Sequence, residues 1–398
     1  MSSIVRDRTG KDYLVPFILV TGLFFLWGFA HSILDVLNKH FQDVLVISKA
    51  RSGLVQATVY GGYFLMALPA GKVIRRWGYR AGIVLGLLLY GIGALMFIPG
   101  GRLMSFPFFL ASLFVIGCGL TCLETSANPY VTVLGDHDSA ARRLNLAQSF
   151  NGLGWIAGPL AGGLLILGED GDISLPYAVI GAVVLVLGLV FSRLPLPSVE
   201  TDGCSGRSPS VQQPVWKVRT FRYGVAALFL YVAAQTGINS FFINYVTEAD
   251  TALSPRTAAL MLSFGGMGLF MAGRLLGTVL MGRISPKTMM SACSAGAVLC
   301  MVLTIYCDGV FGISALCLTY LFESVMFPTV FSMALADIRG EGLKTASSYL
   351  VMSIAGGAVS PVLMGLAGET DMAAGFMIPL VCFVFIALYS VTYRRQSL

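Results

Sequence analysis

Long apolar runs dominate this sequence and restrict the folds that it can adopt. Only 12% of the 398 residues are charged, whereas soluble domains average about 25%. A helix that crosses a bilayer needs about 20 mostly apolar residues, and the runs lack the alternation of a membrane β-barrel. We therefore predict an all-α membrane protein with twelve spans, at residues 14–37, 52–73, 81–98, 107–134, 144–167, 176–193, 223–247, 257–281, 289–306, 310–336, 345–367 and 374–393.

The basic residues predict an orientation. Of 26 Lys and Arg residues, Arg274 lies deep within a predicted span, and 20 lie on or at the edge of one side, which includes both termini. Five fall on the other side: Lys39, Lys49, Arg51, Arg102 and Arg256. An excess of this kind marks the cytoplasmic side. The net charge of +6 comes with no basic reading face, so we expect no nucleic-acid partner. The polar first thirteen residues precede a span-length run, which argues against a cleavable signal peptide.

Residues 194–222 are polar and rich in Gly, Pro and Ser, which is typical of a flexible linker. They separate residues 1–193 from residues 223–398, with six spans in each half. The halves resemble each other: Glu124 and Pro129 in the fourth span have the spacing of Glu323 and Pro328 in the tenth. Parallel repeats of this type are a transporter architecture with the substrate at mid-membrane between the halves. We thus expect two pseudo-symmetric six-helix bundles.

The sequence offers little that suggests catalysis. Loops between spans are too short for a soluble catalytic domain, and no nucleophile–base pair or phosphate-binding loop is evident. The eight cysteines lie mainly inside predicted helices, where thiols pack as small apolar groups, and their spacing matches no metal site. We predict no enzyme activity, no metal and no disulfide framework.

Two acids lie at membrane depth. A charged residue there costs roughly 2.5–3.5 kcal/mol on insertion scales, so it usually faces a cavity and has a function. Glu124 is near the middle of the run from residue 106 to 134, and Asp35 lies toward the end of the first run. A buried carboxyl group can bind a proton, although Asp35 could instead cap the helix or meet water. His31 shares a helix face with Asp35 and is either a structural neighbour or a sugar contact.

Amide side chains recur beside these acids. Thr121, Glu124 and Asn128 form a polar stripe in the fourth span, and Pro129 can kink that helix. Further amides lie in the fifth and seventh spans: Asn145, Gln148 and Asn151, and Gln235 and Asn239. Such amides often only join helices. Amides, a carboxylate and aromatic rings are also what a polyhydroxylated sugar requires, because each hydroxyl both donates and accepts.

Arg274 lies deep in the eighth span and needs a partner. Glu323 is the candidate by charge, in which case both residues are structural or form part of a gate. If the two do not pair, Glu323 is a further proton site. Both readings remain open from the sequence.

The loop Gly71–Arg80 contains Gly78, which allows a tight turn, and basic side chains that can meet acids or helix ends at the cytoplasmic surface. Simple topological anchoring would use the same charges. The loop resembles the signature of the major facilitator superfamily, although Arg75 stands where an acid is usual.

A narrower resemblance extends across nearly the whole chain. It is carried by Phe24–Trp27, Asp35, Gly119–Pro129, Val131–Gly135, Arg143–Gln148, Phe150–Asn151, Gly273–Arg274 and Phe327–Thr329. These strings resemble the fucose–proton symporter family. The resemblance implies that Asp35 and Glu124 are the pair tied to proton coupling and that Asn151 lies near the substrate. His31, Ser32 and Glu323 depart from the family pattern.

We accordingly expect proton-coupled symport of a monosaccharide, L-fucose or a related hexose, into the cell by alternating access. The expected coupling residues are Asp35 and Glu124. The expected partners are the sugar, protons and the lipid bilayer of a bacterial inner membrane. We expect a monomeric carrier with no cofactor beyond the coupling proton. An uncoupled sugar facilitator or a small-molecule exporter of the same fold is the alternative.

Overall fold

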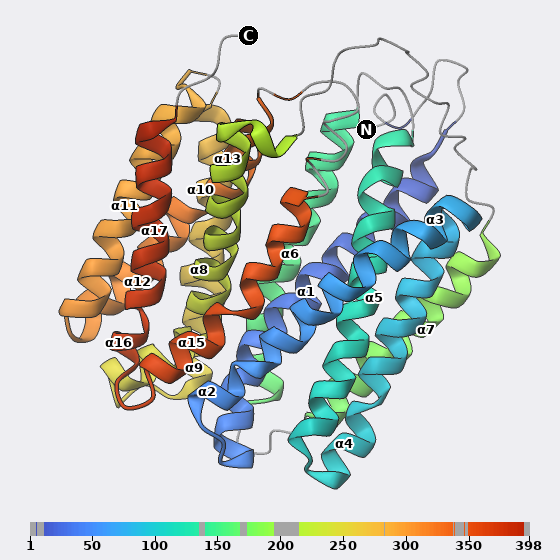
Figure 1. Cartoon of the computed structure of the whole chain (residues 1–398). Helices are drawn as coiled ribbons and strands as arrows, with labels where there is room; N and C mark the ends of the chain where they lie inside the picture. Colours follow the sequence, from blue (N-terminus) through green and yellow to red (C-terminus); the bar gives the residue numbers. More distant parts are fainter. Residues whose placement is uncertain are drawn as a thin grey trace. The chain divides into compact units, whose positions relative to one another are not determined.

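The computed structural model describes residues 5, 12–134, 140–167, 173–194, 215–281, 283–336, 338, 346 and 349–393, and these are largely helical (Figure 1). The chain divides into two compact units: Met1–Phe41 with Thr58–Asp202, and Gln42–Ala57 with Gly203–Leu398. The division at residue 202 falls in the predicted linker. Most of that linker, residues 195–214, lies outside the described residues, so the predicted domain boundaries stay a prediction.

The first unit is built from long helices: α1 (Leu14–Leu45), α3 (Leu54–Leu95), α4 (Phe97–Leu103), α5 (Phe106–Val133), α6 (Ala140–Leu165) and α7 (Ser174–Arg193). The end of α1 after Phe41 and the start of α3 before Thr58 belong to the second unit. The second and third predicted spans merge in α3. The Gly78 backbone interrupts this helix with φ 81° and ψ 172°, a conformation that glycine adopts without steric cost. The predicted turn at Gly78 is therefore present as a kink that separates two helices within α3.

Arg80, just after this bend, fastens α3 to the end of α7. Its Nε donates to the carbonyl oxygen of Phe191 at 3.1 Å, and its Nη2 donates to the carbonyl oxygen of Ser192. The last carbonyl groups of a helix lack partners within the helix and carry partial negative charge. Arg80 of the basic loop thus binds a helix end, which is one of the roles that the sequence suggested for these charges.

Small residues bring α1 and α6 into backbone contact. Gly154 and Gly158 lie one turn apart on α6, facing Ser32 of α1, whose hydroxyl is within hydrogen-bonding distance (3.2 Å) of the Gly154 carbonyl oxygen. A Cβ on Gly154 would lie 2.3 Å from the carbonyl oxygen of Phe25. Membrane helices associate through such close approach, because lipid provides no hydrophobic drive between them.

We expect Gly154→Ala to lower the melting temperature of the detergent-purified protein by several degrees. The added methyl group must push two backbones apart, and overpacking of this kind costs typically 1–3 kcal/mol. Gly22→Ala on α1 is the matched control, because a Cβ there meets nothing within 4 Å. Both changes bring the same gain in helix propensity. Equal melting temperatures for the two variants would show that this contact does not limit stability.

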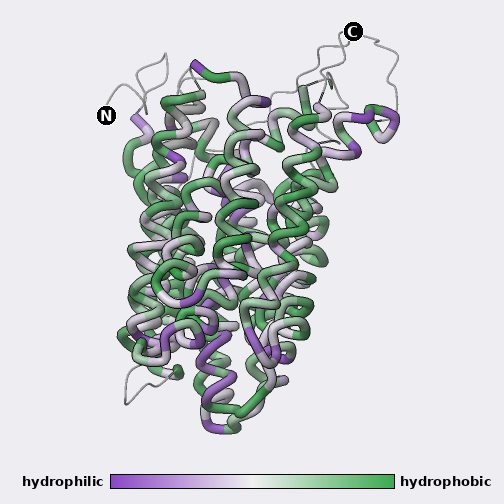
Figure 2. Tube along the Cα trace, turned by 90° about the vertical axis from the view of Figure 1, so that its left-hand side faces the viewer, coloured by the Kyte–Doolittle hydropathy of each residue, from purple (hydrophilic) through white to green (hydrophobic). Residues whose placement is uncertain are grey.

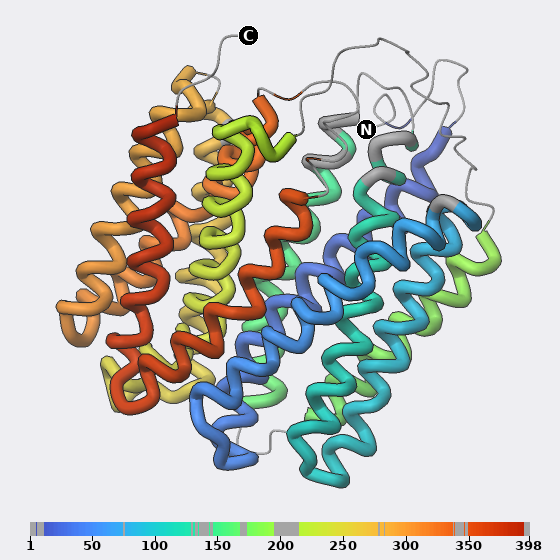
Figure 3. Tube along the Cα trace, viewed as in Figure 1, coloured from blue at the N-terminus to red at the C-terminus, as the bar shows by residue number. Residues whose placement is uncertain are grey.

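The second unit surrounds helix α8 (Arg219–Ala249), drawn yellow-green in Figure 3, which packs against α17 (Met377–Thr392) and the 3₁₀ turn η4 (Ser353–Ala358). Its other elements are α2 (Lys49–Ser52), η2 (Val215–Lys217), α9 (Pro255–Met261), the π-helical η3 (Leu262–Met267), α10 (Gly268–Leu280), α11 (Pro286–Tyr306), α12 (Gly309–Glu323), α13 (Met326–Leu335), α15 (Ser360–Ala367) and α16 (Met372–Gly375).

The predicted tenth span is broken into α12 and α13 at Ser324 and Val325. Pro328 explains the position of the break, because it has no N–H to donate to the carbonyl oxygen four residues earlier, at Ser324. Side chains satisfy the freed carbonyl groups: Tyr231 Oη donates to Glu323 O at 3.1 Å, and Arg274 Nε donates to Ser324 O at 3.4 Å. In the first unit, α5 runs through Pro129 as one helix.

The segment Gln42–Ala57, which we call the strap, docks on the second unit. Lys49 Nζ lies 2.6 Å from Glu248 Oε1 of α8 and donates to Gly368 O at 2.7 Å. The Glu369 carboxylate accepts from the backbone N–H groups of Lys49 and Ala50, at the start of α2. A carboxylate is favoured there by the partial positive charge of a helix N-terminus. The strap is thus held by charge-assisted hydrogen bonds at several points.

Further contacts make the strap's docking tight. Gln42 and Asn244 exchange amide hydrogen bonds, with Asn244 Nδ2 donating to Gln42 Oε1 at 2.6 Å. The backbones also come close: a Cβ on Gly53 would lie 2.7 Å from the carbonyl carbon of Pro361, and one on Gly365 would lie 2.5 Å from Lys49 O. Helices α2 and α15 lie side by side (Figure 1).

Among the described residues, ten helical stretches are long and apolar enough to cross a bilayer. Hydrophobic residues predominate along the helices (Figure 2), and large ones are exposed on their outer surfaces, with Leu68 at 70%, Val279 at 73% and Phe311 at 81% exposure. Exposed apolar side chains on span-length helices are those that lipid would cover. The predicted spans 52–73 and 144–167 coincide with helical segments of α3 and α6 that are not among the ten.

Candidate functional site

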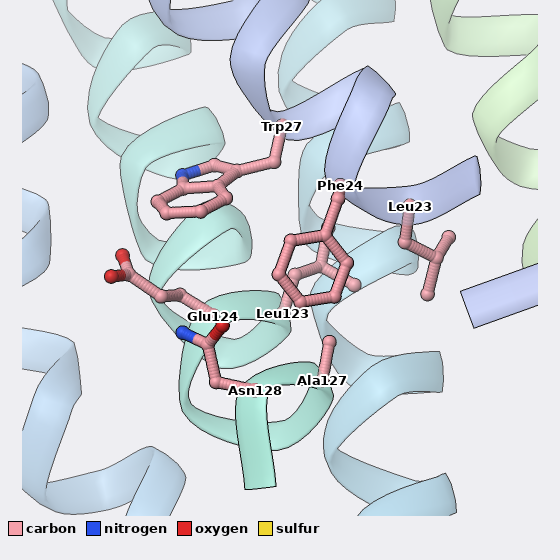
Figure 4. Close-up of a pocket in the computed structure, with 7 residues that line it drawn as sticks. All are labelled: Leu23, Phe24, Trp27, Leu123, Glu124, Ala127 and Asn128. Atoms are coloured by element: carbon pink, nitrogen blue, oxygen red, sulfur yellow. The ribbon is translucent and has the colours of Figure 1, made fainter. Parts of the chain in front are cut away.

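A small pocket opens between α1 and α5 in the first unit. Figure 4 shows the Glu124 carboxyl group and the Asn128 amide one turn apart on α5, with Trp27 and Phe24 projecting from α1 toward them. The lining is Leu23, Phe24, Trp27, Leu123, Glu124, Ala127 and Asn128. Two residues of the predicted polar stripe, Glu124 and Asn128, therefore line this small pocket, and aromatic rings form the other wall.

Tyr63 of α3 links this pocket to the first helix. Its hydroxyl oxygen accepts from Trp27 Nε1 at 2.8 Å and lies 2.8 Å from His31 Nε2. The Glu124 carboxyl group interacts electrostatically with the same hydroxyl. A tyrosine hydroxyl has one proton and two lone pairs, so it can accept from the indole and still donate to one neighbour. A change at Glu124 can therefore alter the hydrogen bond between Tyr63 and His31.

His31 lies in a cluster of aromatic rings. Its ring stacks on Trp155 at a centroid distance of 6.0 Å, and Trp27, Tyr60 and Tyr63 have centroids within 6.1 Å. The side chain is only 7% exposed. Through Tyr63, the structure connects His31 to the pocket at Glu124, but His31 does not line the pocket.

The predicted amides of α6 have clear neighbours. Gln148 Nε2 donates to Asn128 Oδ1 at 3.3 Å, which extends the polar stripe from α5 to α6. Asn151 Nδ2 donates to the carbonyl oxygen of Phe24 at 3.1 Å, so this amide nitrogen joins α6 to α1. The side chain of Asn145 lies outside what the structure describes. The sugar-binding roles of Gln148 and Asn151 stay predictions.

Asp35 is almost fully buried, at 1% exposure, one helical turn beyond His31. It belongs to the buried face of α1 and is not among the residues that line the pocket. The structure therefore brings Glu124, Asn128 and Gln148 together and places Asp35 elsewhere along the same helix as Trp27. Its role in proton coupling stays a prediction.

The remaining predicted site residues belong to the second unit. Glu323 is 0% exposed, and among the described residues neither of its carboxylate oxygens has a hydrogen-bond partner. Arg274 donates to Ser324 O and lies over the Phe270 ring, with its guanidinium carbon 4.7 Å from the ring centroid. The Gln235 side chain is close enough to Glu323 to interact with it, but the geometry falls short of a hydrogen bond. Asn239 is 2% exposed.

Sequence reasoning missed Tyr63 and Tyr60. Both are tyrosines inside a predicted span, three residues apart and so on one face of the helix. A phenol hydroxyl inside a membrane needs a polar partner, and that requirement was the available signal. Trp27 contributed to the family resemblance but was not assigned to the site.

Comparisons with known proteins agree with this architecture. The sequence profile of the Major Facilitator Superfamily matches residues 17–361. The chain is 34% identical to the L-fucose-proton symporter of Escherichia coli, over 97% of this chain and 94% of that protein. It is 33% identical to a glucose/galactose transporter of Brucella abortus, over 95% of this chain and 94% of that protein.

A solved structure of the E. coli fucose:proton symporter matches with a TM-score of 0.69 at 33% identity, covering 97% of this chain and 100% of that one. The prediction of an all-α membrane fold is therefore confirmed, and so is the resemblance stated from the sequence. The chain is a multi-pass membrane protein that belongs to the Major Facilitator Superfamily and, within it, to the family that includes the L-fucose-proton symporter.

Proposed function

We propose that this protein imports a monosaccharide together with protons. The observation that carries the proposal is the pocket in which Glu124 lies beside Asn128 and faces Trp27 and Phe24. The carboxyl and amide groups provide donors and acceptors for sugar hydroxyls, and an aromatic ring can cover the C–H face of a pyranose. The curated relatives named for fucose–proton symport and for glucose/galactose transport support the same substrate class.

Glu124 also suits proton coupling. An ionised carboxylate at membrane depth is costly, and protonation removes much of that cost. In the proposed cycle, Glu124 or Asp35 takes a proton from outside, the sugar binds, and the loaded carrier turns inward by largely rigid-body movement of the two halves. The sugar and then the proton leave, and the empty carrier returns. Net direction comes from the proton gradient, because binding alone drives nothing.

The excess of basic residues on one predicted side supports an orientation with both termini in the cytoplasm, within a bacterial inner membrane. The substrate is L-fucose or a related hexose, since the relatives divide between fucose and glucose/galactose. We propose that the carrier acts as a monomer with no cofactor.

A panel of sugars tests this proposal. Purified protein in vesicles is mixed separately with L-fucose, galactose, glucose, mannose and N-acetylglucosamine, and the pH of a weakly buffered medium is recorded. We expect at least one sugar to make the medium more alkaline, and a proton ionophore to abolish its accumulation. Sugar entry without a change in pH would mean facilitated diffusion, and release of preloaded compounds against a gradient would mean export.

A further inference from the structure

Glu323 is a buried acid that the proposed cycle does not use. It lies at the last residue of α12, where Pro328 forces the helix to break. Its side chain is 0% exposed, and the described residues offer no hydrogen-bond partner to Oε1 or Oε2. An ionised carboxylate without partners in an apolar interior is unstable by several kcal/mol or more. A neutral carboxyl group avoids most of that cost.

Arg274, the cation that the sequence suggested for Glu323, binds other groups. The break at Pro328 frees the Ser324 carbonyl oxygen, to which Arg274 Nε donates at 3.4 Å, and the guanidinium group lies over Phe270. Tyr231 Oη similarly donates to the backbone oxygen of Glu323 rather than to its carboxyl group. Both groups satisfy the broken helix and leave the carboxyl oxygens of Glu323 without a donor.

Helix α8 packs against α12 and carries Tyr231, whose Oη donates to Glu323 O, with Arg219, Arg222 and Tyr223 near its start and Tyr245 and Glu248 near its end. Helix α10 carries Arg274, and α12 itself carries Cys317 and Tyr320. Helix α13 and η3 carry no ionisable side chain. Helix α11 carries Cys293, Cys300 and Tyr306, together with Lys287, whose Nζ donates to Tyr393 O.

The setting of Glu323 parallels that of Glu124. Each acid lies on the fourth span of its half, five residues before a proline. Each interacts with an uncharged polar side chain of its own unit, Tyr63 for Glu124 and Gln235 for Glu323. Trp27 and His31 on α1 have the same four-residue spacing as Tyr231 and Gln235 on α8. The two halves therefore present similar acids in similar places.

We propose that the Glu323 carboxyl group is a further proton-binding site of the carrier, in the C-terminal half, additional to Glu124 and Asp35 and independent of Arg274. The proton adds to one carboxylate oxygen and leaves from it, and no other bond changes. Gln235 can donate its amide N–H to the ionised form or accept from the protonated form, so it can serve both states. The inference rests on the proposed proton-coupled transport and adds an acid of the second unit to it.

Infrared difference spectroscopy on purified full-length protein tests the site without requiring transport. The spectrum is recorded as the pH is stepped through the neutral range, and the carbonyl stretch of protonated carboxyl groups is followed. We expect Glu323→Gln to remove one pH-dependent band that Glu124→Gln leaves in place. Glu323→Asp keeps the carboxyl group and should therefore keep a band at a shifted frequency. Its presence would show that the band depends on the carboxyl group and was not lost in the Gln variant through misfolding.

The outcomes separate this inference from the proposed function. A spectrum of Glu323→Gln identical to that of the unmodified protein, or a Glu323 band that does not change with pH, would overturn the proposed proton-binding role of Glu323. Absence of sugar-induced alkalinisation by the unmodified protein would overturn the proposed symport. If the Glu323 band changes with pH and the unmodified protein shows sugar-induced alkalinisation, the ratio of protons to sugar measured in vesicles should fall in Glu323→Gln.

Discussion

Vesicles that contain the Glu124→Gln variant should fail to accumulate sugar in response to a proton gradient, while still exchanging labelled for unlabelled sugar. Glutamine has the shape of the protonated acid and keeps a donor and an acceptor in the pocket beside Asn128. It cannot take up or release a proton. The variant should therefore behave as a carrier that is fixed in its protonated form, which can turn over with sugar bound but has no link to the gradient.

The size of this effect distinguishes coupling from binding. We expect gradient-driven accumulation to fall to the level of protein-free vesicles, whereas exchange retains a substantial fraction of its rate. The matched control is Glu200→Gln in the predicted linker, which makes the same chemical change outside the spans and should accumulate sugar normally. Normal accumulation by Glu124→Gln would mean that another group carries the coupling proton.

Lys49→Glu should release the strap from the second unit. The substitution places a carboxylate against Glu248 and Glu369, where Lys49 now pairs with the first at 2.6 Å. Juxtaposed like charges cost up to several kcal/mol, less where solvent screens them, and Glu248 is 37% exposed. A shift of about 2 kcal/mol would change the balance of docked and undocked forms by roughly 30-fold.

Hydrogen–deuterium exchange of the peptide that covers residues 42–57 measures this shift directly. The amide hydrogens of Lys49 and Ala50, which donate to Glu369, should lose protection by roughly the same 30-fold factor. The charge-swapped double variant Lys49→Glu with Glu248→Lys restores an opposite pair and should recover part of the protection. Unchanged exchange in the single variant would show that backbone packing at Gly53 and Gly365, rather than charge, holds the strap.

Local patterns in the sequence were sufficient to predict most helices and the main acid of the site. Run length defined the spans, Gly78 marked the bend in α3, and the three- and four-residue spacing of Thr121, Glu124 and Asn128 placed one polar stripe on α5. These signals work because they act over one or two helical turns. Glu124 and Asn128 do face one pocket, as that spacing required.

The partners of these residues could not be predicted in the same way. Charge alone suggested Glu323 for Arg274, but Pro328 frees a carbonyl oxygen that Arg274 uses instead. That choice depends on the path of a broken helix and not on residue type. Tyr63 likewise belongs to the site only because α3 packs against α1. The residue spacing within its own span did not predict which helix it would contact.

The strap also has a consequence for how the chain is made. Its backbone hydrogen bonds to Glu369 join residues up to 320 positions apart. A ribosome adds about 5–20 residues per second, so the strap must wait on the order of half a minute before the residues that it binds are all made. Until Glu248 is made, Lys49 has neither Glu248 nor Glu369 to bind, and Glu369 follows Glu248 by more than 100 further residues. The strap can therefore reach its final conformation only when synthesis is nearly complete, and chains that end before α15 should leave it open to proteases.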